Sequence, residues 1–92
     1  MNVAEVTLTK VFPVQKEHTY DGILTRFIAV GHAKTVCISQ IEDQPLYIDI
    51  YGLEVNSVED LPSGNAEKSV ELAQTMPRGD ALIRLAADFL AQ

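Results

Sequence analysis

The sequence predicts a small α+β domain, in which a four-stranded antiparallel β-meander is followed by two C-terminal helices packed on one face of the sheet. In the first half of the chain, apolar residues recur at every second position, as they do in strands whose side chains alternate between two faces. Turn-forming residues divide this half into consecutive runs. Beyond Val55 the apolar spacing becomes that of amphipathic helices. We therefore expect one domain over residues 1–92, with the sheet in 1–55 and a helical layer in 56–92.

The first predicted strand covers Val3–Phe12. Its alternation places Val6, Leu8 and Phe12 on one side, where Lys10 is the one polar exception. Pro13 follows and cannot donate a ladder hydrogen bond. The polar segment 15–22 ends in an Asp-Gly pair, which suits the positive φ of a turn. We expect this segment to be a loop.

The next three strands are predicted over Ile23–Val30, Thr35–Ile41 and Leu46–Val55. The first two flank a short connection with Gly31, which permits a tight hairpin, so antiparallel pairing is expected. The third has the cleanest alternation in the chain, with Leu46, Ile48 and Ile50 on one side and Tyr47, Asp49 and Tyr51 on the other.

The helical layer is predicted to contain two helices. Ser57–Asp60 resembles a capping box on a very short helical turn before them. The first helix is expected over Ala66–Thr75 with Asn65 as its N-cap, and with Ala66, Val70 and Ala73 as its apolar positions. The second runs from about Pro77 through Asp80 to Leu90. Its apolar stripe is broad and consists of Leu82, Ile83, Leu85, Ala86, Phe89 and Leu90.

The central hairpin is apolar on both of its sides, which is unusual for a sheet with one face in water. Phe27, Ala29, Val36 and Ile38 share one side, and Leu24, Ile28, Val30, Cys37 and Ile41 share the other. A single helical layer cannot cover both sides, and the chain has few residues left for a second layer. We therefore hypothesise that the domain self-associates, most simply as a two-fold homodimer.

Composition restricts the class of protein. Apolar residues make up 47% of the chain and charged residues 22%, an ordinary balance for a folded domain. The formal charge of −6 opposes attachment to nucleic acid, which depends on clustered Lys and Arg. No apolar stretch approaches the ~20 residues of a membrane span, and the N-terminus does not resemble a signal peptide. Cys37 is the only cysteine, so a reducing cytoplasm is the expected location.

Catalytic, metal and cofactor motifs are not recognisable in the sequence. Cys37 and His32 could form a nucleophile and base with Asp49 as orienting acid, but a cysteine among aliphatic strand residues is far more often a small buried apolar group. His18 and His32 lack metal-ligand spacing, and the glycines stand singly instead of forming a phosphate-binding loop. We expect no cofactor and no metal.

The predicted interaction surface combines the tyrosine-bearing strand with one side of the hairpin. Its residues are Tyr47, Asp49, Tyr51, Leu24, Ile28, Val30 and Ile41. A Tyr-x-Asp-x-Tyr stripe suits a basic partner protein and equally suits an ordinary half-exposed edge strand. The expected function is a small interaction or regulatory module acting as a homodimer. The alternative is a ligand-binding domain whose apolar pocket lies between the sheet and the C-terminal helix, lined by Phe27, Ile38, Tyr47 and Phe89.

Overall fold

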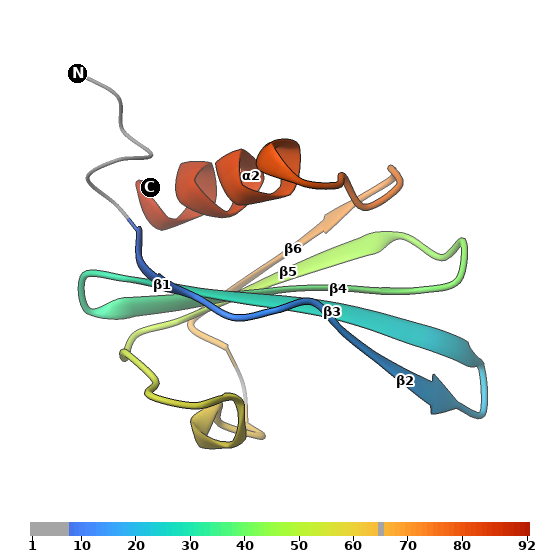
Figure 1. The fold of residues 1–92 in the computed structure, drawn as a ribbon, viewed down its shortest axis with the longest axis horizontal. Coiled ribbons are helices and arrows are strands. Elements are labelled where there is room, and N and C mark those ends of the chain that lie inside the picture. The colour runs from blue at the N-terminus through green and yellow to red at the C-terminus, as the bar shows by residue number, and fades with distance from the viewer. Residues whose placement is uncertain (1–7, 65) are drawn as a thin grey trace.

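The computed structural model describes residues 8–64 and 66–92, which form a six-stranded antiparallel sheet with one α-helix across one face (Figure 1). The elements are, in order, β1 (Leu8–Val11), β2 (Gln15–Thr19), β3 (Gly22–Gly31), β4 (Lys34–Ile41), β5 (Leu46–Tyr51), the 3₁₀ turn η1 (Val58–Asp60), β6 (Lys68–Leu72) and α2 (Asp80–Leu90). The strand order is β1-β3-β4-β5-β6, and β2 pairs with β3 on the same edge as β1. The fold is thus mixed α+β and mostly sheet, and the prediction of four strands with two helices is wrong.

β2 forms where the sequence predicted a loop. All its residues except Thr19 are exposed, so it has no apolar side, and the alternation used to find strands could not reveal it. The Asp21-Gly22 pair lies in the tight turn that joins β2 to β3, where Gly22 has φ 129°. The turn signal was therefore correct, and the strand that it implied on its N-terminal side was missed.

β6 forms where the sequence predicted the helix Ala66–Thr75. It pairs with β5 through Ile48↔Val70 and Leu46↔Leu72. The side chains of Val70 and Leu72 therefore lie on the same face of the sheet as those of Ile48 and Leu46. The apolar residues of this segment fit a helical and a strand period about equally, and the unsatisfied edge of β5 decides between them. The expected N-cap Asn65 lies outside the described residues.

A bulge changes the facing of the first strand. Leu8 pairs with Gly31 and Lys10 pairs with Val30, so one extra residue interrupts the register. Because a one-residue shift reverses the face of every later side chain, Leu8 packs against the helix-side core and Phe12 packs on the opposite face. The prediction that these two residues share a side is wrong, and residues 3–7 of the predicted strand lie outside the described part of the chain.

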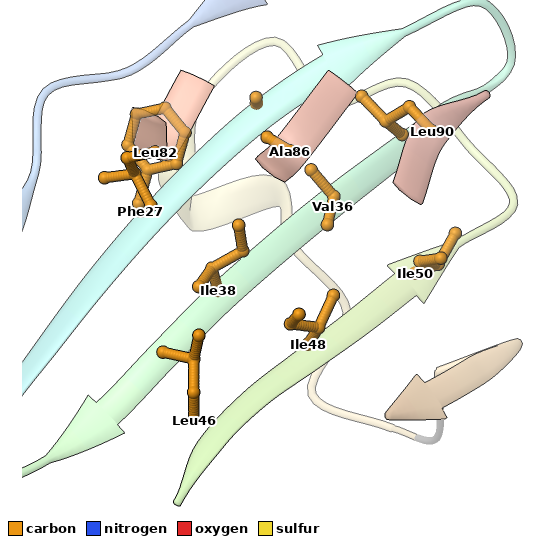
Figure 2. Packing of buried hydrophobic residues seen from close by; sticks show 10 residues of the cluster. Phe27, Val36, Ile38, Leu46, Ile48, Ile50, Leu82, Ala86 and Leu90 are labelled. Atoms are coloured by element: carbon orange, nitrogen blue, oxygen red, sulfur yellow. The ribbon is translucent and has the colours of Figure 1, made fainter. Parts of the chain in front are cut away.

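The main core lies between α2 and the sheet (Figure 2). Leu82, Ala86 and Leu90 are spaced four residues apart, so they form one stripe along α2 that faces the sheet. The sheet contributes Phe27 and Ala29 from β3, Val36 and Ile38 from β4, and Leu46, Ile48 and Ile50 from β5. The antiparallel hairpin of β3 and β4 and the C-terminal helix thus agree with the sequence prediction.

The opposite face of the sheet is covered in part by another segment of the chain. Ile28, Val30, Cys37 and Val55 form a second buried cluster, against which Phe12, Tyr51, Val58 and Leu61 pack. The segment after β5 is held there by Thr35, whose Oγ1 donates to the Leu53 carbonyl at 2.7 Å and accepts from the Val55 N–H at 3.3 Å. The expectation that few residues remain for a second layer is therefore wrong, because the connection between β5 and β6 supplies one.

α2 is too short to cover the helix side completely. Its 11 residues span roughly 16 Å, whereas the ten residues of β3 span roughly 33 Å. The helix contacts β3 and β4 and leaves the sheet uncovered toward β2 and the start of β3 (Figure 1). Each face of the sheet is therefore only partly covered, by α2 on one side and by the segment after β5 on the other.

Candidate functional site

All seven residues of the predicted interaction surface lie on the sheet face opposite α2. The register pairs Leu24 with Ile41 and Cys37 with Asp49, which places β3, β4 and β5 side chains together on this face. Ile28 and Val30 are only 2% exposed because the segment after β5 covers them, so they cannot touch a partner in this conformation. The other five are at least partly exposed. Together with Arg26 and Ser39, they form what we call the open face: Leu24, Arg26, Ser39, Ile41, Tyr47, Asp49 and Tyr51.

Arg26 is a residue of the open face that the sequence analysis did not single out. It pairs with Ser39 of β4 and with Gln15 of β2, and its side chain is half-buried. Its Nε atom is buried and has no hydrogen-bond partner among residues 8–64 and 66–92. A hollow of about 370 Å³ lies beside it, lined by Gln15, Lys16, Glu17, Leu24 and Arg26. A lone cation within an apolar run has no periodic signal, which is why the pattern of the sequence did not reveal it.

Asp49 supplies the negative charge of the open face, and Tyr47 and Tyr51 lie beside it on β5. The Ser69 hydroxyl donates to Asp49 Oδ1 at 2.6 Å. A hydrogen bond to Glu71, together with the charge of that carboxylate, raises the pKa of Tyr47, whose side chain is 42% exposed. Burial raises the pKa of Tyr51, and the nearby Asp49 charge adds to this shift. Both phenols are therefore neutral donors at physiological pH.

Cys37 does not have the surroundings of a nucleophile. Burial raises the pKa of its thiol to about 11, and although Arg26 lowers this pKa, Asp49 raises it further. The thiolate is the reactive form, so its population at neutral pH is very small. His32 lies in the turn before β4, five residues from Cys37 in the chain, and the start of β4 at Lys34 is already roughly 10 Å along the strand from Cys37. The structure thus brings Asp49 next to Cys37 and leaves His32 apart from both.

A second hollow lies on the helix side, at the end of the sheet that α2 leaves uncovered. Its volume is about 490 Å³, and its lining comes from β2, β3 and β4, from the residues just before β2 and just after β4, from the segment before α2 and from the first turn of α2. The residues that line it are Val14, Lys16, Ile23, Thr25, Gln40, Glu42, Thr75, Met76, Pro77, Arg78, Gly79 and Leu82. We call this hollow the helix-end groove.

The helix-end groove differs from the pocket expected from the sequence. Phe27 and Ile38 lie in the closed core, and Tyr47 lies on the opposite face of the sheet. Gln40 shapes the groove instead, since its side chain is buried and both its amide nitrogen and its amide oxygen make hydrogen bonds. Its Nε2 donates to the carbonyls of Gln44 and Gln74 at 2.8 and 2.9 Å, and its Oε1 accepts from the Met76 N–H at 3.0 Å. These bonds fix the segment before α2 above the sheet.

Metal-ligating residues do not gather within residues 8–64 and 66–92, where no group of three His, Cys, Asp or Glu side chains could hold an ion. His18 pairs with Ile23 at the start of β3, and His32 lies just past its end, so the strand separates the two histidines. In the described part of the chain, no helix has the length and apolar character that crossing a bilayer requires.

Comparison with other proteins gives no family assignment. The chain matches no protein-family model, and neither the curated proteins nor the solved structures contain a significant match.

Proposed function

We propose that this protein is an interaction module that forms a two-fold homodimer through its open face. The observation that carries the proposal is the buried, unpartnered Nε of Arg26. A buried donor without an acceptor costs about 1–3 kcal/mol, and native structures rarely leave such groups unpaired. Because this Nε is closed to solvent in the single protomer, a second molecule can supply its acceptor only together with a change in the Arg26 rotamer. Arg26 is only half-buried and borders a hollow of about 370 Å³, which leaves room for such a change.

Arg26 and Asp49, the two charged residues of the open face, are complementary, and Glu17 and Glu71 lie beside them on the same side of the sheet. Arg26 on β3 and Asp49 on β5 share the face but are separated by β4, which puts them roughly 10 Å apart across the strands. In a two-fold interface, residue i of one protomer contacts residue j of its partner and the reverse contact is also made. Two open faces can therefore form two Arg26–Asp49 pairs, one on each side of the axis.

The surroundings of this pair are typical of an interface core. Tyrosine and arginine are enriched at such cores, and Leu24, Ile41 and Tyr47 supply apolar area next to the charges. The core of one protomer does not need these side chains, because α2 and the segment after β5 pack elsewhere on the sheet. Self-association would use area that the fold itself leaves in water.

Charge reversal tests the proposal. Sedimentation equilibrium across low to high micromolar concentrations should show a dimer for the parent protein. Arg26→Glu or Asp49→Arg alone should weaken the dimer by about 30-fold or more, since breaking a buried charge pair costs about 2 kcal/mol or more. The double variant Arg26→Glu/Asp49→Arg should recover most of the affinity, because it restores both pairs with their signs exchanged.

The matched control reverses the exposed charges Arg84 and Asp88 of α2, which lie on the other side of the sheet. Arg84→Glu and Asp88→Arg should leave the dimer unchanged. Circular dichroism and urea unfolding establish that each variant is folded. A parent protein that stays monomeric at every concentration would refute the proposal, and so would equal losses in the open-face and α2 variants.

A further inference from the structure

A second binding site is suggested by the helix-end groove, and it is independent of self-association. We propose that this groove binds a small amphipathic carboxylate, with the carboxylate between Lys16 and Arg78 and the apolar body against the wall formed by Val14, Ile23, Met76, Pro77 and Leu82. Its volume of about 490 Å³ lies within the ~300–1,000 Å³ typical of small-molecule sites.

The groove exists because of two fixed features of the fold. α2 begins only at Asp80 and does not extend over the start of β3, which leaves the floor of the groove open. The three hydrogen bonds of Gln40 hold the segment before α2 above that floor. The cavity is thus bounded by a strand surface and a tethered segment, and its shape is present before a ligand arrives.

The apolar wall explains why the ligand carries a hydrocarbon body. Val14 and Ile23 line the groove, and they are 46% and 38% exposed. Met76, Pro77 and Leu82 line it from the opposite side. Exposed apolar side chains gathered in a concave site lose contact with water when an apolar ligand enters, which favours binding.

The charges that face the groove explain why the ligand is an anion. Lys16 on β2 and Arg78 before α2 are the two cations of the lining, and both are exposed. Among the described residues that line the groove, Glu42 is the only acid, and its Oε1 already accepts the Ile23 N–H at 2.9 Å. The lining therefore has a net charge of +1 within a chain whose formal charge is −6. A local positive site on an acidic protein attracts an anion and not a cation.

Decanoate is a suitable probe, with decan-1-ol and acetate as partial ligands that lack the charge and the apolar body respectively. Amide chemical shifts in a titration below the micellar concentration should change for decanoate at Ile23, Thr25 and the segment 75–82. Decan-1-ol and acetate should each bind at least tenfold more weakly than decanoate, because each makes only one of the two kinds of contact.

Substitutions separate the groove from general hydrophobic binding. Lys16→Gln and Arg78→Gln should each weaken decanoate binding by about tenfold, and Arg84→Gln, an exposed position on α2 outside the groove, should have no effect. Ile23→Thr keeps a β-branched residue in β3 and should reduce the preference for decanoate over shorter carboxylates.

Equal binding of decanoate and decan-1-ol would overturn the proposal. Shifts spread over the open face, or equal effects of Arg78→Gln and Arg84→Gln, would also overturn it. These outcomes do not depend on whether the protein dimerises.

Discussion

Single residues of this fold are expected to have large effects on the free energy of unfolding, and Cys37 is one of them. The thiol is buried between β3 and β5, and burial raises its pKa from 9.0 to about 11. In the unfolded chain the thiol ionises near its ordinary pKa, so between pH 9 and 11 the unfolded state has lost the proton that the folded state still holds. The free energy of unfolding therefore falls as the pH rises through this window.

The size of this effect can be measured. One pKa unit corresponds to about 1.4 kcal/mol, so the full shift is worth about 2–3 kcal/mol. Urea unfolding of the parent protein should show a loss of this order between pH 8.5 and 11. Cys37→Ala should show a smaller loss over the same range, and identical pH profiles for the two proteins would contradict the assignment.

Gly22 gives the second effect at this scale. Its φ of 129° is rarely adopted by other residues, and a Cβ there would collide with the Glu42 side chain. Gly22→Ala should therefore lower the free energy of unfolding by about 1–3 kcal/mol. Gly64→Ala is the matched control, because a Cβ at Gly64 meets no atom within 4 Å and its φ is not positive. Similar urea midpoints for the two variants would contradict this reading.

At the residue scale, local chemistry was predictable and long-range position was not. The Asp21-Gly22 turn could be predicted because a dipeptide determines its own backbone. Burial of Cys37 could also be expected from its aliphatic neighbours in sequence. The burial of Arg26 Nε without a partner could not be predicted, since it depends on which side chains the sheet places beside Arg26.

Among the elements, α2 offers the clearest test. Ala86 is fully buried against the sheet, whereas Ala81 is exposed on the same helix. Ala86→Leu should destabilise the protein by about 1–3 kcal/mol, since a larger side chain must displace the packed core. Ala81→Leu should change the free energy of unfolding by less than about 0.5 kcal/mol. Denaturant unfolding of both variants measures the difference, and equal values would mean that α2 packs through another face.

The elements that were predicted correctly carry several apolar residues whose spacing matches their secondary structure. α2 and the β3–β4 hairpin belong to this group. β2 was missed because neither of its sides is apolar, and β6 was taken for a helix because its short sequence fits two periods. Both are edge strands, and their conformation is determined by the neighbouring strand that they pair with, which no local pattern records.

For the whole molecule, the apolar character of both sides of the hairpin could be predicted from the sequence. The segment that covers the side opposite α2 could not. The sequence shows that both sides are apolar, and the structure buries one side in the main core and covers part of the other, where Leu24 and Ile41 stay partly exposed. The missing information was that Val55, Val58 and Leu61 fold back beneath β3 and β4, which requires knowing where the chain turns after β5. The apolar area left for a partner is accordingly smaller than expected and is confined to the open face.

The segment after β5 also contributes to the stability of the whole molecule. Val55 is 3% exposed and packs with Ile28, Val30 and Cys37. Val55→Ala should cost about 1–3 kcal/mol in the free energy of unfolding, whereas Val14→Ala, at an exposed position, should cost much less. If both variants unfold at the same urea concentration, the segment after β5 does not stabilise the fold.

The position of β6 has a kinetic consequence. Each of β3, β4 and β5 is joined to its neighbour by a short turn, whereas β6 reaches β5 only after the connection of residues 52–67. Closing a longer loop costs more chain entropy, so native contacts of β6 form late in folding and open first when the native state fluctuates. Hydrogen–deuterium exchange should therefore release the β6–β5 amides ahead of those between β3 and β4, and the protein would begin to come apart at this edge.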